Sequence, residues 1–122
     1  MKKLYLAIIA LFIAGSTWAQ CSDLFFSEYV EGSSNNKALE IYNPTAVPVN
    51  LTGYKIQIYT NGSATVGSTY NLTGTVAAGD VFVLAHKNAN LAIKALADDT
   101  TQVGGVMNFN GNDVLALLNG TT

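Results

Sequence analysis

The segment YKIQIYTNG places the strongest constraint on how this chain can fold. Its large apolar side chains Tyr54, Ile56 and Ile58 alternate with other residues, and a period of two is typical of a strand buried on one face. The Asn61-Gly62 pair that follows favours a tight hairpin turn, because both residues tolerate a positive φ. The sequence therefore predicts a hairpin here, with its return strand or the strand after it in the segment STYNLTG.

Glycine, asparagine and threonine interrupt the remainder of the chain at short intervals, and the apolar runs between them have the length of strands. Further strands are predicted within residues 23–32, 37–44, 79–87 and 113–120. Only the segment NANLAIKALAD departs from this pattern, and it favours one short helix of about two to three turns. The sequence therefore predicts an all-β fold with one short helix.

Two of these runs carry apolar residues on both faces. Simple alternation in the first run places Leu24 and Phe26 on one face, with Phe25 and Tyr29 on the other. In the run GDVFVLAHK, apolar residues again occupy both faces, which predicts a central strand covered by two layers.

The first 19 residues have the pattern of a secretory signal peptide. Lys2 and Lys3 precede an apolar stretch that ends near Ala14, and the small residue Ala19 closes a plausible cleavage region. The apolar stretch is shorter than the roughly 20 residues needed to span a bilayer. We therefore expect a protein that is secreted or located at the cell surface, with no transmembrane segment after cleavage.

Cys21 raises the alternative of a lipid-modified N-terminus, because it lies just after the predicted cleavage site. A lipoprotein signal has a small residue directly before the cysteine, whereas Gln20 occupies that place. Ordinary secretion is favoured, and lipidation stays an alternative. Cys21 is the only cysteine of the chain, so no intramolecular disulfide can form and packing must stabilise the fold.

Charge limits the partners of the remaining domain, residues 20–122, which is long enough for one core. Two of the six lysines lie in the signal segment, so four lysines face eight acidic residues and the formal charge becomes −4. The chain has no arginine. Since lysine and arginine supply most non-specific affinity for phosphates, strong binding of nucleic acid by this domain is not expected.

The end of the sequence carries a second hairpin signal, Asn119-Gly120, which requires a return strand. Only two residues follow it. We therefore expect the domain to lack its last strand, which leaves an unpaired edge of the kind that natural domains usually cover.

Four segments, taken in order, resemble the lamin-tail domain as it occurs in secreted bacterial proteins. They are LFFSEYVEGSSNNKALEIYNPT, VNLTGYKIQIY, GDVFVLAH and FNGNDVLALLNGT. The most specific part comprises Glu28, residues 31–36, residues 40–44 and residues 51–54, and the resemblance extends from about Asp23 to Thr122.

This resemblance implies an immunoglobulin-like β-sandwich. It also implies a secreted, non-catalytic module for interaction or tethering that forms part of a larger exported protein. One alternative is an N-terminal accessory domain of an extracellular nuclease or phosphoesterase whose catalytic domain lies beyond residue 122. Another is a surface module that binds calcium or glycans.

The polar loop after the first predicted strand is the candidate metal site. Glu28, Glu31, Asn35, Asn36 and Glu40 offer the hard oxygen ligands that calcium accepts. The alternative is that the serines and asparagines of this loop shape a turn through local bonds from side chains to the backbone. Because no regular calcium-loop spacing is present, we favour the structural explanation and expect no required cofactor, with calcium left open.

Glu40 lies in an apolar strand between Leu39 and Ile41, so the face that it occupies matters. An inward carboxylate would need a partner, because an unpaired buried charge is costly. For an inward Glu40, Lys37 or a backbone amide of the first strand could serve as this partner. We expect Glu40 to be a structural, hydrogen-bonded residue of the sandwich rather than a catalytic one.

Catalysis by this stretch is not expected. His86 is the sole histidine and is predicted to be a surface or hydrogen-bonded residue at a strand end. The chain offers no second histidine, no arginine to bind a phosphate and no Gly-x-Ser-x-Gly elbow.

The tyrosines suggest a contact surface for a polymer or carbohydrate. The candidates for such an aromatic strip are Tyr29, Tyr42, Tyr54, Tyr59 and Tyr70. Core packing is the expected role of Tyr54, and Tyr59 is the better exposed candidate. The partner itself, whether a protein, a cell surface or a polymer, is not specified by the sequence.

Overall fold

The computed structural model describes residues 21–100 and 105–120, which form two β-layers with one short helix. The strands are β1 (Phe25–Glu31), β2 (Lys37–Tyr42), β3 (Val49–Asn50), β4 (Tyr54–Tyr59), β5 (Ser68–Asn71), β6 (Thr75–Val76), β7 (Val81–Ala85) and β8 (Val114–Asn119). The other elements are the helix α2 (Leu91–Lys94) and the 3₁₀ turns η1 (Thr60–Gly62) and η2 (Gly105–Asn108). The predicted all-β class and the immunoglobulin-like β-sandwich are confirmed.

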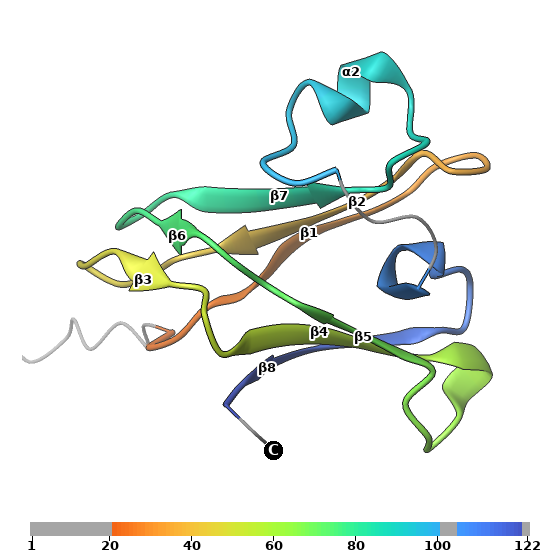
Figure 1. Ribbon diagram of the computed structural model, residues 1–122, viewed down its shortest axis with the longest axis horizontal. Helices are drawn as coiled ribbons and strands as arrows, with labels where there is room; N and C mark the ends of the chain where they lie inside the picture. The colour runs from red at the N-terminus through yellow and green to blue at the C-terminus, as the bar shows by residue number, and fades with distance from the viewer. Residues whose placement is uncertain (1–20, 101–104, 121–122) are drawn as a thin grey trace, which may run out of the picture.

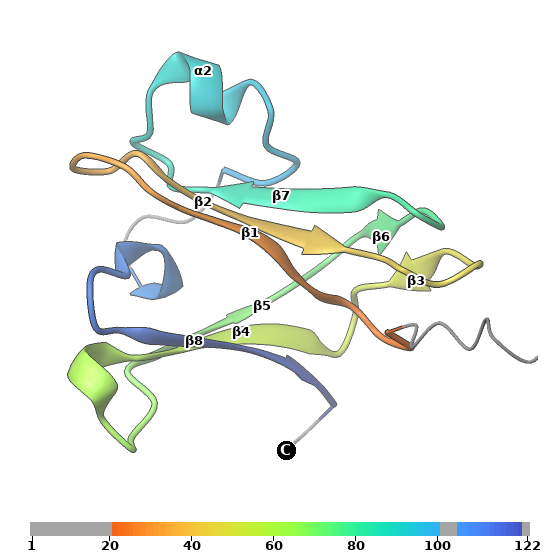
Figure 2. The ribbon, with the colours of Figure 1, turned by 180° about the vertical axis from the view of Figure 1, so that it is seen from behind.

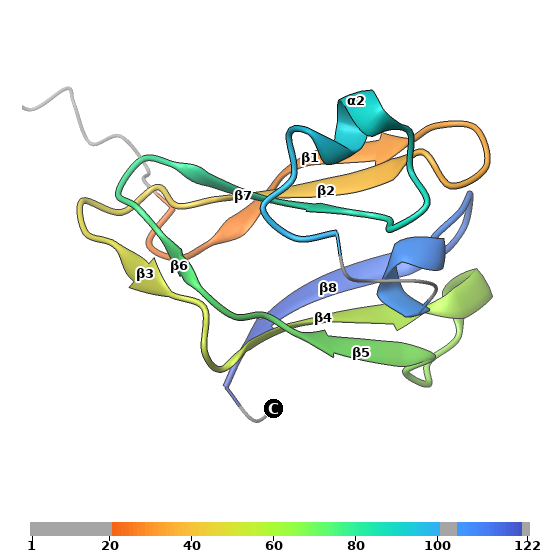
Figure 3. The same cartoon turned by 45° about the horizontal axis from the view of Figure 1, so that its top comes forward.

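Two three-stranded antiparallel sheets form the layers (Figure 1). The first sheet has the order β1-β2-β7 and the second has the order β5-β4-β8, while β3 and β6 form a small pair at one end. β1 and β8 lie on one side of the sandwich, as the view from behind shows (Figure 2). β5 and β7 lie on the opposite side, and α2 stands over the outer surface of the first sheet (Figure 3).

The hairpin predicted from the alternating segment is present but has a longer loop. β4 pairs with β5, and the register joins Ile58 to Ser68. Asn61 and Gly62 both adopt positive φ, at 54° and 69°, as the turn signal requires. The loop continues to residue 67, because an irregular segment follows η1. Asp113, just before β8, accepts a hydrogen bond from the Asn61 amide at 2.7 Å.

A bulge in β1 overturns the simple alternation expected there. The pairing of β1 with β2 shifts between Phe26 and Glu28, so Ser27 is an extra residue. A single extra residue transfers all later side chains to the opposite face. Tyr29 therefore shares the inner face with Phe26, instead of the outer face with Phe25.

β7 is an outer strand of its sheet, and the prediction of a central strand was wrong. Within the described residues, β7 pairs only with β2 along its length. Its other edge is covered by Asp98 and Asp99, whose amides donate to the carbonyl of Val83 at 2.8 and 3.2 Å. The Asp98 carboxylate also accepts a bond from the Val83 amide at 2.8 Å.

The predicted helix is real but shorter than expected. α2 has a single turn, and the Oδ1 of Asn90 caps its start by accepting a bond from the amide of Ile93 at 2.9 Å. The segment after it turns back, and Asp98 and Asp99 in this segment bond to β7.

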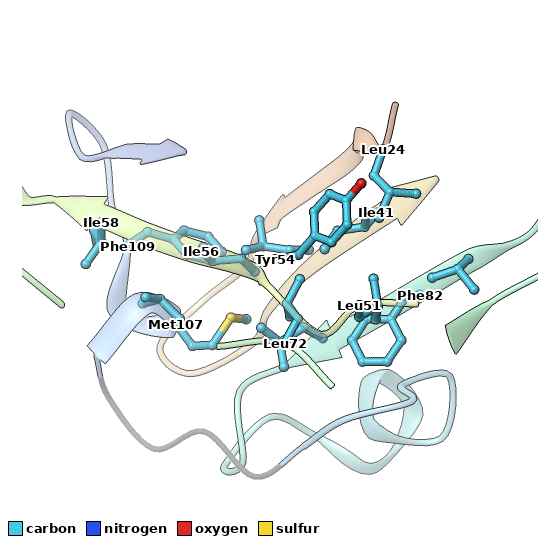
Figure 4. Close-up of a cluster of buried hydrophobic side chains, with 14 residues drawn as sticks. Leu24, Ile41, Leu51, Tyr54, Ile56, Ile58, Leu72, Phe82, Met107 and Phe109 are labelled. Atoms are coloured by element: carbon cyan, nitrogen blue, oxygen red, sulfur yellow. The ribbon is translucent and has the colours of Figure 1, made fainter. Parts of the chain in front are cut away.

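The core lies between the two sheets (Figure 4). Inward residues of β2 and β4 meet there, as the alternation of β4 predicted. Sequence reasoning missed the contribution of η2 and the residue after it. Val106, Met107 and Phe109 are at most 1% exposed, although they lie in a segment rich in glycine and asparagine.

Asn43 connects the end of the first sheet to the small β3-β6 pair. Its side chain is fully buried, and its Nδ2 donates to the carbonyls of Val47, Val76 and Ala77 at 2.9, 3.2 and 3.0 Å. Its Oδ1 accepts bonds from the amide and hydroxyl of Thr45 at 3.0 and 2.7 Å. β2 ends at Tyr42, inside the predicted range of residues 37–44, and the buried bonds of Asn43 fix this end.

Candidate functional site

The outer surface of the first sheet carries two carboxylates side by side. The bulge at Ser27 turns Glu28 outward, where it lies directly opposite Glu40 in the register of β1 and β2. Val83 of β7 continues this row on the far side of Glu40. The neighbouring row is apolar, because Val30 lies opposite Ala38.

A groove of about 330 Å³ lies between these rows and the segment of α2. Its apolar lining consists of Val30, Ala38, Leu39, Val81, Val83, Ile93 and Leu96. Glu28 and Glu40 are the charged residues that line it. We call this feature the outer groove.

Leu96 is the most exposed apolar residue of the groove, with 77% of its surface accessible. It follows α2, which stands over the outer surface of the first sheet (Figure 3). Val30, on the opposite side of the groove, is 38% exposed. Apolar side chains that remain accessible around a concave surface are typical of a contact site.

The two carboxylates of the groove have different surroundings. Glu40 accepts a bond from the Ser27 hydroxyl at 2.7 Å. Among the residues that the structure describes, no side-chain hydrogen bond or ion pair engages Glu28. Like charges directly opposite each other on a sheet are destabilising, so this pair is suited to a cation from outside.

Neither partner considered for an inward Glu40 is used. Glu40 does not face the core, because its neighbours Leu39 and Ile41 occupy the inner face. Lys37 is buried and its Nζ lies 5.2 Å from the centroid of the Phe109 ring, where a cation interacts favourably with the ring face. The expectation of a hydrogen-bonded Glu40 holds, with the Ser27 hydroxyl as the donor.

Glu31 points away from the groove and joins the two layers. Its carboxylate accepts bonds from the Gly111 amide, at 3.1 and 3.2 Å, and from the Tyr29 hydroxyl at 2.9 Å. The Gly111 amide is the main reason that the pKa of Glu31 is lowered. Burial, assisted by Glu31, raises the pKa of Tyr29 to about 12.

Asn35 and Asn36 belong to the turn between β1 and β2. Main-chain bonds shape this turn: the Gly32 amide donates to the Asn36 carbonyl at 2.8 Å, and the Lys37 amide donates to the Asn35 carbonyl at 2.8 Å. The side chain of Asn36 instead accepts a bond from the distant Asn90 amide at 2.9 Å. The prediction of a turn is right, whereas the expected local side-chain bonds do not form it.

The five candidate calcium ligands therefore do not share one loop. Glu28 and Glu40 face the outer groove, Glu31 faces Gly111, and Asn36 faces the loop before α2. Within residues 21–100 and 105–120, no group of three or more histidine, cysteine or acidic residues is arranged to hold a metal ion.

Asp23, which precedes β1, joins the two layers with its carboxylate, as Glu31 does at the end of β1; we call these two carboxylates the clamps. The Tyr54 hydroxyl donates to Asp23, and the Nδ2 of Asn119 donates to the same carboxylate at 3.4 Å. The bond from Tyr54 is the main cause of the lowered pKa of Asp23. Burial, with Asp23 as a further cause, raises the pKa of Tyr54 to about 12.

The predicted aromatic strip is not formed. Tyr54 is buried, as expected, and Tyr70 also packs against the core. Tyr59 and Tyr42 belong to different sheets and both are half-buried. Among the tyrosines that the structure describes, the exposed one is Tyr29, at 49%, and the centroid of its ring lies 4.5 Å from that of the Phe109 ring.

His86 is a buried, hydrogen-bonded residue rather than a surface residue. It is 2% exposed, its amide donates to the Lys37 carbonyl at 3.0 Å, and its Nδ1 accepts a bond from the Asn88 amide at 3.0 Å. These bonds give His86 a structural role at the end of β7.

Sequence reasoning missed the outer groove itself. The signal that could have indicated it is the run of β7, which is apolar on both faces, together with the leucines of the following segment. The outward valines of β7 line the groove, where a second layer had been expected to cover them.

Two packed antiparallel sheets, a groove on one outer surface and carboxylates that serve as structural clamps define an immunoglobulin-like module. The lamin tail domain family matches residues 18–122, and the chain belongs to this family. Neither the comparison with curated proteins nor the comparison with solved structures gave a match. In the described part of the chain, no helix is long and apolar enough to cross a membrane.

Proposed function

We propose that this protein is an exported, non-catalytic interaction module that holds a partner against the outer groove. The lamin tail domain is a family of non-catalytic immunoglobulin-like domains, which supports an interaction role. The observation that carries the proposal is the groove, where accessible Leu96 and Val30 flank a paired set of carboxylates.

The carboxylates of Asp23, Glu31 and Asp98 form hydrogen bonds that stabilise the fold, whereas those of the groove do not join the layers. Asp23 and Glu31 tie the two layers together, and Asp98 covers the edge of β7. Glu28 and Glu40 form no such tie between layers. Their position among apolar side chains is typical of a surface that a partner covers.

Export is part of the proposal, and the pattern of residues 1–19 supports it. Mass spectrometry of the protein recovered from the producing cells tests it, with an unmodified chain beginning at Gln20 as the expected result. An acylated Cys21 would instead indicate a lipid anchor at the cell surface. A full-length chain retained inside the cell would contradict export.

Site-specific photo-crosslinking tests the binding role. A crosslinking amino acid is placed at Leu96 in the outer groove, or at Val47 as a control that is 62% exposed on the loop before β3. Each variant is exposed to extracellular and cell-surface proteins of the organism that makes it. We expect a discrete crosslinked product at Leu96 that is absent at Val47.

Equal products at both positions, or none at Leu96, would contradict the assignment of the groove as the contact surface. Hydrolysis of a phosphodiester or another ester by the purified chain would contradict the non-catalytic role.

A further inference from the structure

We propose that the outer groove recognises a peptide segment in which a lysine or arginine is flanked by bulky apolar residues. This inference rests on the proposed function and specifies the chemistry of the partner. It draws on two properties of the groove, its paired carboxylates and its apolar walls.

The carboxylates determine the charge of the partner. Glu28 and Glu40 are cross-strand neighbours, so their side chains share one spot on the sheet. A single ammonium or guanidinium group placed there contacts both and replaces their mutual repulsion with charge-assisted hydrogen bonds. The formal charge of −4 on residues 20–122 favours the approach of such a cation over longer distances.

The walls determine the rest of the partner. Val30 on one side and Leu96 on the other remain accessible, while Val83 and Ile93 line the space between them. Covering these side chains with apolar groups of the partner removes apolar surface from water, which favours binding. Apolar residues next to the cationic residue of the peptide would pack against these walls, and their side chains must fit a groove of about 330 Å³.

Other ligand classes fit this groove less well. Phosphates and nucleic acids would meet two carboxylates and no cation among the lining residues. Calcium takes about six to eight oxygen ligands, whereas most of the lining side chains are aliphatic. A second copy of the chain brings the same negative formal charge, so it lacks the complementary sign.

A selection from a displayed library of random peptides tests the proposal. The library is selected on the mature chain and then depleted on the variant Val30→Thr/Leu96→Asn, which makes both walls polar. We expect the retained peptides to be enriched in lysine or arginine flanked by leucine, isoleucine or aromatic residues. Acidic or uncharged retained peptides, or no peptide that depends on the walls, would overturn the proposal.

Variants then separate the charge from the walls by fluorescence anisotropy with the most enriched peptide. Glu28→Gln/Glu40→Gln should weaken binding by about tenfold or more, because the cation of the peptide loses its charge-assisted hydrogen bonds to both carboxylates. Asp113→Asn removes one negative charge at the second sheet, keeps the Oδ1 acceptor of the Asn61 amide and loses the Oδ2 acceptor of the Asn110 amide. Asp113 does not line the groove, so the affinity of this variant for the peptide should be unchanged. An unchanged affinity of the glutamine variant would overturn the charge assignment.

The exposed leucines provide a matched control for the walls. Leu96, just after α2, lines the groove, whereas Leu91, which is 80% exposed at the start of α2, does not. Leu96→Asn should weaken peptide binding and Leu91→Asn should not. Equal losses in the two variants would contradict the placement of the peptide.

The proposal and the broader function can fail separately. If crosslinking at Leu96 succeeds but the selected peptides lack a cation, the binding role stands and the chemistry inferred for the groove is wrong. If Leu96 gives no crosslink and no wall-dependent peptide is selected, both are wrong. Self-association of the chain that Leu96→Asn abolishes would identify a second copy as the occupant and overturn the peptide proposal.

Discussion

The middle strands of the two sheets present very different outer surfaces. On β4, Tyr59 donates to Gln57 at 3.0 Å, and Gln57 donates to Thr69 of β5 at 3.3 Å, so the polar groups bond to one another. On β2, the outward Glu40 instead lies opposite Glu28 and beside apolar Val83. Gln57 and Tyr59 of the second sheet therefore bond to one another and to a neighbouring strand, whereas the first sheet places two like charges opposite each other, of which Glu40 is bonded to Ser27 and Glu28 is left for an external partner.

The largest loss of stability in the first sheet should come from removing the buried side chain of Asn43, which fixes the end of β2. Asn43→Ala deletes the donor and acceptor of a fully buried side chain and leaves carbonyls such as that of Val76 without their partner. We expect the free energy of unfolding to fall by about 3 kcal/mol, measured by urea denaturation. Asn71→Ala, at an exposed position of β5, is the control, and a similar loss in the two variants would contradict this role.

A smaller loss should follow from distorting the hairpin that sets Glu28 opposite Glu40. In Gly32→Ala the added Cβ would lie 2.6 Å from the carbonyl oxygen of Asn36, closer than such atoms approach. The backbone must shift, and we expect a loss of about 1–2 kcal/mol in thermal or urea unfolding. Ser33→Ala in the same turn should change stability by less than about 0.5 kcal/mol. A fully stable Gly32→Ala would show that the turn adapts freely.

Acid should weaken the clamps between the layers. The pKa values of Asp23 and Glu31 are lowered in the folded protein. Their stabilising contribution is therefore present above the unfolded pKa values and is lost as the pH falls through the folded values. In Asp23→Asn/Glu31→Gln, unfolding followed from neutral to acidic pH should show a weaker pH dependence than in the parent chain. If the loss of stability at acidic pH were the same in this variant as in the parent chain, these two carboxylates would be excluded as its cause.

The smallest effect should be a gain. Glu28→Gln removes the repulsion with Glu40, so we expect the free energy of unfolding to rise by about 0.2–0.5 kcal/mol at low salt. The gain should shrink as the salt concentration rises, because salt screens exposed charges. Gln57→Ala on the second sheet removes the internal bonds with Tyr59 and Thr69 and should instead lower stability. A loss of stability in Glu28→Gln would contradict the account of unrelieved repulsion.

Local patterns predicted much of this fold. The alternation in β4 identified its buried face, and the Asn61-Gly62 pair identified residues with positive φ. Both features depend on residues close together in the sequence, which explains why local sequence patterns could predict them. The family resemblance supplied the arrangement of the strands in two layers and is confirmed by the match over residues 18–122.

The missed features depend on contacts between distant segments or on one irregular residue. Nothing in the composition of β1 marks Ser27 as a bulge, yet this residue decides the faces of Glu28 and Tyr29. Asn43 resembles an ordinary turn residue, and its buried role depends on the carbonyl of Val76, which is distant in sequence. The outer groove needs Leu96 to return over β1 and β2, which no local pattern encodes.

An amide-shift titration of the nitrogen-labelled chain with the selected cationic peptide tests the central claim most directly. The account predicts that signals of the first sheet around Val30, Glu40 and Val83, together with Leu96, move on binding. The signals of Lys55 and Gln57 on the second sheet should stay in place. Shifts confined to the second sheet, or none at saturating peptide, would contradict the claim that the outer groove is the contact surface.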